Sequence, residues 1–123
     1  MAERDVQAEV MLEFGALPYL RIWRQNTGVA VYESKTGAKT FVKYGVPGGA
    51  DLSGLLACGK RVELECKREG GGRHEPEQKR FGAMIARMGG MYALVSSVAD
   101  ARAALDSHLT VCDTCRSRRQ FAI

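Results

Sequence analysis

The chain has 123 residues, which is the length of one ordinary domain and leaves no room for separate cofactor and substrate domains. Hydrophobic residues make up 46% and charged residues 26% of the chain, a globular balance that excludes wholesale disorder. The formal net charge is +4, from 18 basic and 14 acidic residues, and favours polyanionic partners such as nucleic acid only mildly.

The sequence predicts neither a membrane span nor a secretion signal. No apolar stretch approaches the roughly 18–20 residues that a membrane helix needs. The segment from Met1 to Asp5 is charged and lacks the apolar centre of a signal peptide. We therefore expect a soluble intracellular protein of cytoplasmic location, with no membrane partner and with its four cysteines reduced.

The first half of the chain predicts one helix followed by strands. Apolar residues from Val6 to Leu17 recur at near-helical spacing, and Gly15 and Pro18 end the helix. Apolar and basic residues then alternate over 20–24, as in a strand. Two further apolar runs flank a polar loop that contains lysines, and they predict a hairpin with a long basic tip: 29–32 and 41–44.

The second half predicts strands alternating with helices. Asp51 opens a short apolar run, and the segment 61–67 alternates strictly between apolar and charged residues. A helix is expected from Pro76 until a pair of glycines stops it. A buried strand over 91–95 and a last helix, capped by a serine, follow.

These elements predict an α/β fold in which helices flank a mixed β-sheet, in the approximate order αβββαβα. We expect residues 1–110 to form one domain. Residues 111–123 are a basic C-terminal tail with no clear periodicity, and they either belong to this domain or are disordered.

Asp51, Glu65 and Lys67 form the pattern that points to chemistry. Residues i and i+2 of a strand point the same way, so Glu65 and Lys67 share a face that Asp51 would reach from the neighbouring strand. Two converging carboxylates make an oxygen site suited to Mg²⁺ or Mn²⁺, and a lysine beside them would position a water. The alternative is a solvated ladder of cross-strand charge pairs, because Glu-x-Lys alone is a common pattern.

The context of these residues favours the metal site. A series of short motifs surrounds them: Arg-Gln-Asn-Thr-Gly at 24–28, Gly-Val-Pro-Gly-Gly-Ala-Asp-Leu at 45–52, Glu-Cys-Lys at 65–67, Glu-Gln-Lys-Arg-Phe at 77–81, Met-Gly-Gly-Met-Tyr at 88–92 and Val-Ser-Ser at 95–97. Each motif is weak alone, and their ordered series is specific. In this order, over residues 2–106, the series resembles the virus-type replication-repair nuclease (VRR-NUC) domain, a family of the PD-(D/E)xK nuclease superfamily.

The resemblance implies a restriction-endonuclease-like core that carries a metal-dependent active site. Asp51 and Glu65 would bind Mg²⁺ or Mn²⁺ with help from the backbone carbonyl of Cys66. Lys67 would orient or activate the attacking water, and Gln78 would support the active site or the scissile phosphate.

An acidic residue of the first helix usually joins the metal site in this family. Glu3 matches that position best, and Glu9 matches it less well. The sequence departs from the family pattern at two positions: Ala50 replaces the usual proline before the aspartate, and Cys66 replaces the usual Val or Ile of the Glu-x-Lys motif. Neither departure removes a proposed ligand.

The function implied is a metal-dependent, structure-selective DNA endonuclease. Small stand-alone relatives from phages and bacteria resemble Holliday-junction resolvases and act as homodimers, so a branched DNA and a second copy of the chain are the expected partners. The location implied is the cytoplasm of a bacterial or phage-infected cell. Two alternatives stay open: a non-catalytic nucleic-acid-binding module on the same fold, and a nuclease that acts on flaps or single strands.

Basic and polar residues near the expected site are candidates for DNA contacts. They lie at the end of a predicted strand and on or beside the hairpin tip, where ordinary solvated side chains are the alternative. They are Arg24, Asn26, Lys35, Lys39 and Lys43.

His108, Cys112 and Cys115 form an H-x3-C-x2-C pattern near the C-terminus. Three zinc ligands at this spacing would need a fourth from Cys58, from another chain or from water. Structural zinc sites generally show four clear ligands, so the sequence favours reduced cysteines on a terminal segment over zinc. A Cys112–Cys115 disulfide formed on purification is a further alternative.

Overall fold

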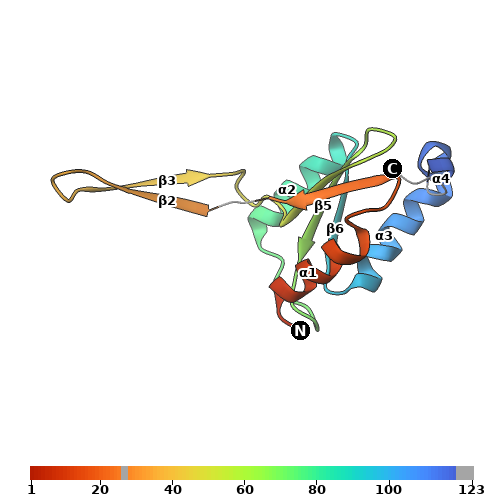
Figure 1. Cartoon of the computed structure of the whole chain (residues 1–123), viewed down its shortest axis with the longest axis horizontal. Coiled ribbons are helices and arrows are strands. Elements are labelled where there is room, and N and C mark those ends of the chain that lie inside the picture. The colour runs from red at the N-terminus through yellow and green to blue at the C-terminus, as the bar shows by residue number, and fades with distance from the viewer. Residues whose placement is uncertain (26–27, 119–123) are drawn as a thin grey trace.

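The computed structural model describes residues 1–25 and 28–118, and of residues 28–29 and 43–44 only the backbone. A four-stranded sheet lies between helices, and a two-stranded hairpin projects from this body (Figure 1). The elements are α1 (Glu3–Phe14), β1 (Leu20–Arg24), β2 (Gly28–Glu33), β3 (Lys39–Tyr44), β4 (Leu52–Leu56), β5 (Arg61–Cys66), α2 (Pro76–Arg87), β6 (Met91–Val95), α3 (Val98–Val111) and α4 (Asp113–Arg118).

The large sheet is mixed, with strand order β1-β4-β5-β6. The first three strands pair antiparallel, and β6 pairs parallel to β5. A parallel pair needs a crossover connection, and α2 supplies it. The expected mixed sheet flanked by helices is therefore confirmed.

Two apolar clusters hold the helices against opposite faces of the sheet. The larger cluster joins α1 and α3 to the sheet, and the smaller joins α2 to it through Ala50, Phe81 and Ile85. The strict alternation of β5 explains this, since Val62, Leu64 and Cys66 belong to the larger cluster while the intervening residues face α2. The charged face of β5 thus lies under a helix.

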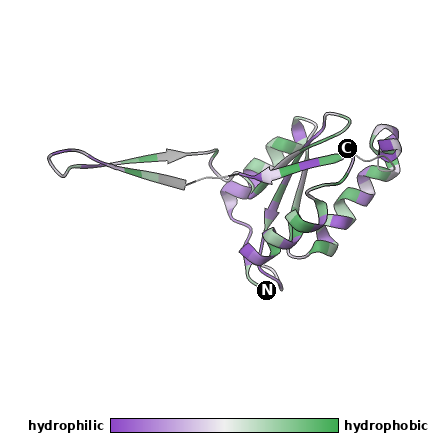
Figure 2. Ribbon diagram, in the orientation of Figure 1, coloured by the Kyte–Doolittle hydropathy of each residue, from purple (hydrophilic) through white to green (hydrophobic). Residues whose placement is uncertain are grey.

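The predicted hairpin is present as β2 and β3, which pair with each other from Gly28–Tyr44 to Glu33–Lys39. Figure 2 shows hydrophobic stretches along this projecting hairpin. Tyr32 is 62% exposed and Phe41 is 67% exposed, so these two side chains enter neither core cluster. The hairpin is therefore held by its own backbone ladder.

The expected order αβββαβα is wrong in its number of elements. Five strands precede α2, because β2 and β3 form a separate sheet and add to the three strands that precede α2 in the large one. A further helix, α4, follows α3; its six residues are too few to show periodicity in the sequence.

The charged face of β5 differs from a solvated ladder. Glu63 and Glu65 are buried, and Lys67, directly after the strand, is buried as well. Their burial follows from the position of α2, which covers this face of the sheet. Across residues 1–25 and 28–118, no helix combines the length and the apolar character needed to cross a membrane.

Candidate active site

The antiparallel pairing of β4 with β5 brings Asp51 and Glu65 together. Leu52 pairs with Leu64, so Asp51, which directly precedes β4, lies opposite Glu65 at the end of the ladder. The backbone N–H of Cys66 donates a 2.9 Å hydrogen bond to Asp51 Oδ2, and the backbone N–H of Gln25 donates one of 2.9 Å to the Asp51 carbonyl. The Asp51 carboxylate is therefore held at a defined place beside β5.

Glu65, Lys67 and Gln78 form one hydrogen-bonded network. Gln78 Nε2 donates to Glu65 Oε1 at 2.8 Å, and Lys67 Nζ donates to Gln78 Oε1 at 2.9 Å. Lys67 Nζ lies 3.5 Å from Glu65 Oε1, so the two charges also form an ion pair. Glu65 is 2% exposed and Lys67 6% exposed, and such buried charges need these partners.

The start of α2 fixes Gln78 in this network. Gln78 Oε1 also accepts a 2.9 Å hydrogen bond from the backbone N–H of Glu75, which forms the reciprocal capping box of the helix. The turn before Asp51 approaches the same helix: Gly48 has a φ of 73°, and a Cβ there would lie 2.2 Å from the Glu77 carbonyl oxygen. Only glycine fits this close approach.

Glu3 completes a cluster of three acids. Carboxylate oxygens of Glu3, Asp51 and Glu65 all lie within 4.8 Å of one another. Glu3 is the first residue of α1, and the chain before it is tied by an ion pair between the Met1 amino group and Glu69 at 3.2 Å. Glu9, on the exposed side of α1, is not part of the cluster.

Burial makes Asp51 and Glu65 hard to ionise. The pKa of Glu65 is raised to about 7, first by burial and then by the charge of Asp51, against the opposing effect of Lys67. Burial also raises the pKa of Asp51, although the Cys66 N–H, Glu65 and Lys67 oppose the rise. A bound cation would relieve this unfavourable charge.

The donor set fits a hard divalent cation. Among the residues that the structure describes, Glu65 Oε2 is the one buried side-chain oxygen or nitrogen without a hydrogen-bond partner. An orphaned carboxylate oxygen beside two more carboxylates is the environment that Mg²⁺ or Mn²⁺ occupies in proteins. Lys67 lies at the edge of this cluster, within reach of Glu65.

The candidate DNA-contact residues whose side chains the structure describes are Arg24, Lys35 and Lys39. Arg24 is exposed at the end of β1, opposite Leu52 in the register and so one residue from Asp51. Lys35 and Lys39 are exposed on the β2–β3 hairpin, which projects from the body that contains α1, β5 and α2 (Figure 1). Asn26 lies outside the described residues. Lys43 lies in β3, and its side chain is outside the described part of the chain.

Sequence reasoning assigned no role to Glu63. This residue is 1% exposed and is paired twice: Ser53 Oγ donates to Glu63 Oε2 at 2.6 Å, and Arg61 Nε donates to Glu63 Oε1 at 2.7 Å. It lines a cavity of about 360 Å³ together with Phe81 of α2. Strand alternation places Glu63 on the face of Glu65, and this was the signal that could have found it.

The chain was compared with protein-family models, with curated proteins and with solved structures, and none of the three comparisons finds a match. The resemblance to the VRR-NUC domain therefore stays a prediction that rests on the sequence motifs. The site itself is a structural finding: three carboxylates, a buried lysine and a glutamine converge from α1, from the start of β4, from the end of β5 and from α2.

Proposed function

We propose that this chain is a metal-dependent, structure-selective DNA endonuclease of the VRR-NUC type, built on a restriction-endonuclease-like core. The observation that carries the proposal is the convergence of Glu3, Asp51 and Glu65 beside the buried Lys67. Glu3 and Glu65 are 62 residues apart in the chain, yet their carboxylates lie together. Glu65 Oε2 has no hydrogen-bond partner among the described residues.

The carboxylates of Asp51 and Glu65 would hold Mg²⁺ or Mn²⁺ together with the backbone carbonyl of Cys66, and Glu3 would add a further oxygen. When bound, such an ion supplies Lewis-acid stabilisation of the phosphate and lowers the pKa of a coordinated water. The Cys66 backbone serves the site in a second way, because its N–H holds the Asp51 carboxylate at 2.9 Å.

Lys67 would orient the attacking water by hydrogen bonding from Nζ and stabilise negative charge on the scissile phosphate. Its position supports this role: the backbone N–H of Lys67 donates to the Val95 carbonyl at 2.8 Å, and Gln78 fixes its side chain. Gln78 is a positioning residue, since its amide holds both Lys67 and Glu65 and leaves the second oxygen of Glu65 without a partner.

The proposed substrate is branched DNA, bound by a homodimer. Two copies related by a two-fold axis would present two sites to the two strands of a four-way junction. The projecting hairpin supports a DNA-binding role, because its exposed Lys35 and Lys39 could contact backbone phosphates.

The test is cleavage of labelled DNA as a four-way junction, a flap, a duplex and a single strand, each in Mg²⁺, Mn²⁺ or EDTA. We expect paired nicks in the junction that require a divalent metal and that disappear in Lys67→Ala. Lys79→Ala is the matched control, because Lys79 is an exposed lysine of α2 outside the network, and we expect it to cleave.

Circular dichroism would show that both lysine variants fold. Full cleavage by folded Lys67→Ala would contradict the proposed mechanism. Tight binding of the junction without cleavage in any metal would contradict the proposed nuclease activity and favour a non-catalytic binding module. Metal-dependent cleavage of flaps or single strands alone would support nuclease activity but contradict the four-way junction as the substrate.

A further inference from the structure

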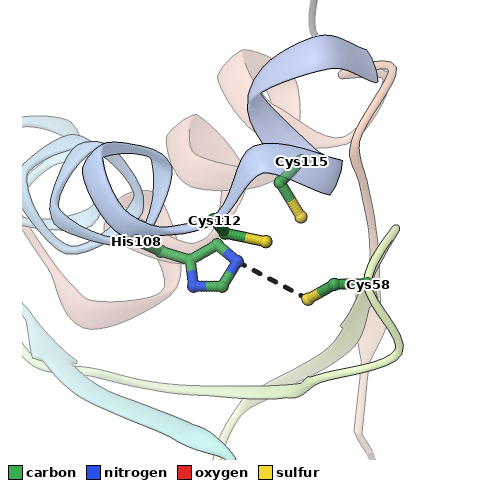
Figure 3. Close-up of side chains that lie close together, drawn as sticks. All are labelled: Cys58, His108, Cys112 and Cys115. Carbon is green, nitrogen blue, oxygen red and sulfur yellow. Dashed lines mark hydrogen bonds between the residues drawn. The ribbon is translucent and has the colours of Figure 1, made fainter.

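A second group of metal-ligating side chains lies far from the carboxylates. Cys58, His108, Cys112 and Cys115 each offer one ligand atom, and these four atoms all lie within 4.8 Å of one another. Figure 3 shows the three sulfur atoms and the imidazole pointing toward a common centre. The proposed function uses none of these four residues.

Three separate elements supply this cluster. Cys58 lies in the turn between β4 and β5, and His108 lies in the last turn of α3. Cys112 is the C-cap of α3 and Cys115 is in α4. The backbone N–H of Cys112 donates to the His108 carbonyl at 3.0 Å, so the end of α3 sets the spacing of these two ligands.

The spacing fits a tetrahedral ion. With Zn–S of about 2.3 Å and Zn–N of about 2.1 Å, tetrahedral geometry separates a sulfur and a nitrogen ligand by about 3.6 Å and two sulfurs by about 3.8 Å. Cys58 Sγ lies 3.6 Å from His108 Nε2. All pairs of ligand atoms lie within 4.8 Å, so small side-chain adjustments would bring the sulfur atoms to the separation that a tetrahedral zinc ion requires.

The cysteines are free thiols, and Cys115 is fully buried. His108 is 8% exposed, which is unusual for a polar ring unless it has a partner. The terminal helix α4 has six residues, too short to be stable alone in water, and needs tertiary contacts to persist. A shared ligand set would connect this helix to the β4–β5 turn.

We propose that Cys58, His108, Cys112 and Cys115 bind one Zn²⁺ ion as a structural site. Three thiolates and one imidazole suit zinc and exclude the hard cations of the carboxylate site. Four protein ligands leave no open position, so the ion stabilises the fold and does not take part in hydrolysis. Binding forms three Zn–S bonds and one Zn–N bond and releases the thiol protons to solvent.

The first measurement is the zinc content of the full chain, purified with a reductant and without chelator. We expect about one zinc per chain in the wild type and a loss of bound zinc in Cys58→Ser and in His108→Asn. His74→Asn is the matched control, because His74 is the one other histidine of the chain and lies outside the cluster. It should keep its zinc, and so should Asp51→Asn.

Cobalt substitution gives a readout that does not depend on how the variants fold. Wild-type protein stripped of metal under reducing conditions and loaded with Co²⁺ should show the intense visible bands of tetrahedral cobalt and sulfur-to-metal charge transfer. Loading with zinc should raise the Tm by more than about 10 °C.

Four results would overturn the proposal. The first is folded, reduced wild-type protein that neither contains nor binds zinc. The second is a cobalt spectrum without thiolate charge transfer, and the third is loss of zinc in Asp51→Asn together with its retention in Cys58→Ser. Recovery of a Cys112–Cys115 disulfide from protein kept under reductant would likewise contradict the site. None of these results depends on nuclease activity, so this proposal and the proposed function can fail separately.

Discussion

The β4–β5 hairpin carries an oxygen-rich site at its open end and a sulfur-rich cluster at its turn. Asp51 and Glu65 lie at the open end, and Cys58 lies in the turn at the other end of the five-residue strand β4. The two ends differ in ligand chemistry, so a cell that holds both magnesium and zinc would fill them differently. One pair of strands thus places two different sets of candidate metal ligands in one small domain.

The two sites also differ in how their charge is balanced. The carboxylates lie beside the positively charged Lys67, and Glu65 keeps one oxygen without a partner among the described residues. The sulfur cluster brings four ligands and has no position left for substrate. We therefore propose a chemical role for the first site and a stabilising role for the second.

Exchange of one ligand at each site gives the largest expected effect. Asp51→Asn should lower junction cleavage by about 10³-fold or more, because a ligand and a transition-state charge are both lost, and should keep its zinc. Cys58→Ser should lose zinc and thermal stability, and should retain cleavage at a temperature where it is folded.

The test measures three properties of each variant: single-turnover cleavage, zinc content and Tm. We expect each variant to lose a different property. Asp106→Asn, an exposed acid of α3, is the control for removing a carboxylate. If both variants lost the same property to the same degree, the assignment of different roles to the two ends of the hairpin would be wrong.

Truncation of Gln78 should have an intermediate effect. Gln78→Ala removes the hydrogen bonds that hold Lys67 Nζ and Glu65 Oε1, so we expect a loss of about 10–100-fold in activity. The Mg²⁺ concentration for half-maximal rate should rise, which a loss of stability alone would not produce. Glu77→Ala, at the preceding exposed position, is the control. An unchanged magnesium requirement would count against a positioning role.

The smallest expected effect is a pH dependence of stability. The folded-state pKa of Glu65 is about 7, against an ordinary value of 4.5, because burial and Asp51 disfavour its charge. Between these two pH values the folded protein binds more protons than the unfolded chain, so without Mg²⁺ the free energy of unfolding should fall as the pH rises.

Glu65→Gln should remove this dependence. The free energy of unfolding of the variant should therefore increase relative to that of the wild type as the pH rises from about 4.5 to about 7. Denaturant unfolding in parallel at several pH values measures the difference, and saturating Mg²⁺ should reduce it. A constant difference across this range would show that Glu65 ionises normally in the folded protein.

Local periodicity made the acidic end predictable from the sequence. The two-residue repeat of a strand places Glu65 and Lys67 on one face, and the structure brings both to Asp51. The burial of that face was not predictable, since it depends on how α2 packs across the sheet. For the same reason, the sequence could not decide whether the charged residues of β5 form a solvated ladder.

Long-range placement explains what the sequence left undecided. Cys58 and His108 are 50 residues apart, and only the pairing of β4 with β5 and the packing of α3 bring them together. The sequence favoured reduced cysteines over zinc, because His108, Cys112 and Cys115 alone offered three ligands and the fourth was one of several options. The hairpin was predicted from its two apolar runs, but its separation from the main sheet depends on pairings that no local pattern encodes.

The most direct test of the central claim is cleavage of a labelled four-way junction by metal-stripped protein to which Mg²⁺, Mn²⁺ or Zn²⁺ is returned singly. Our account predicts paired nicks with Mg²⁺ or Mn²⁺, none with Zn²⁺ alone, and none in Lys67→Ala under any condition. Cleavage that persists in EDTA, or equal cleavage by folded Lys67→Ala, would contradict the account.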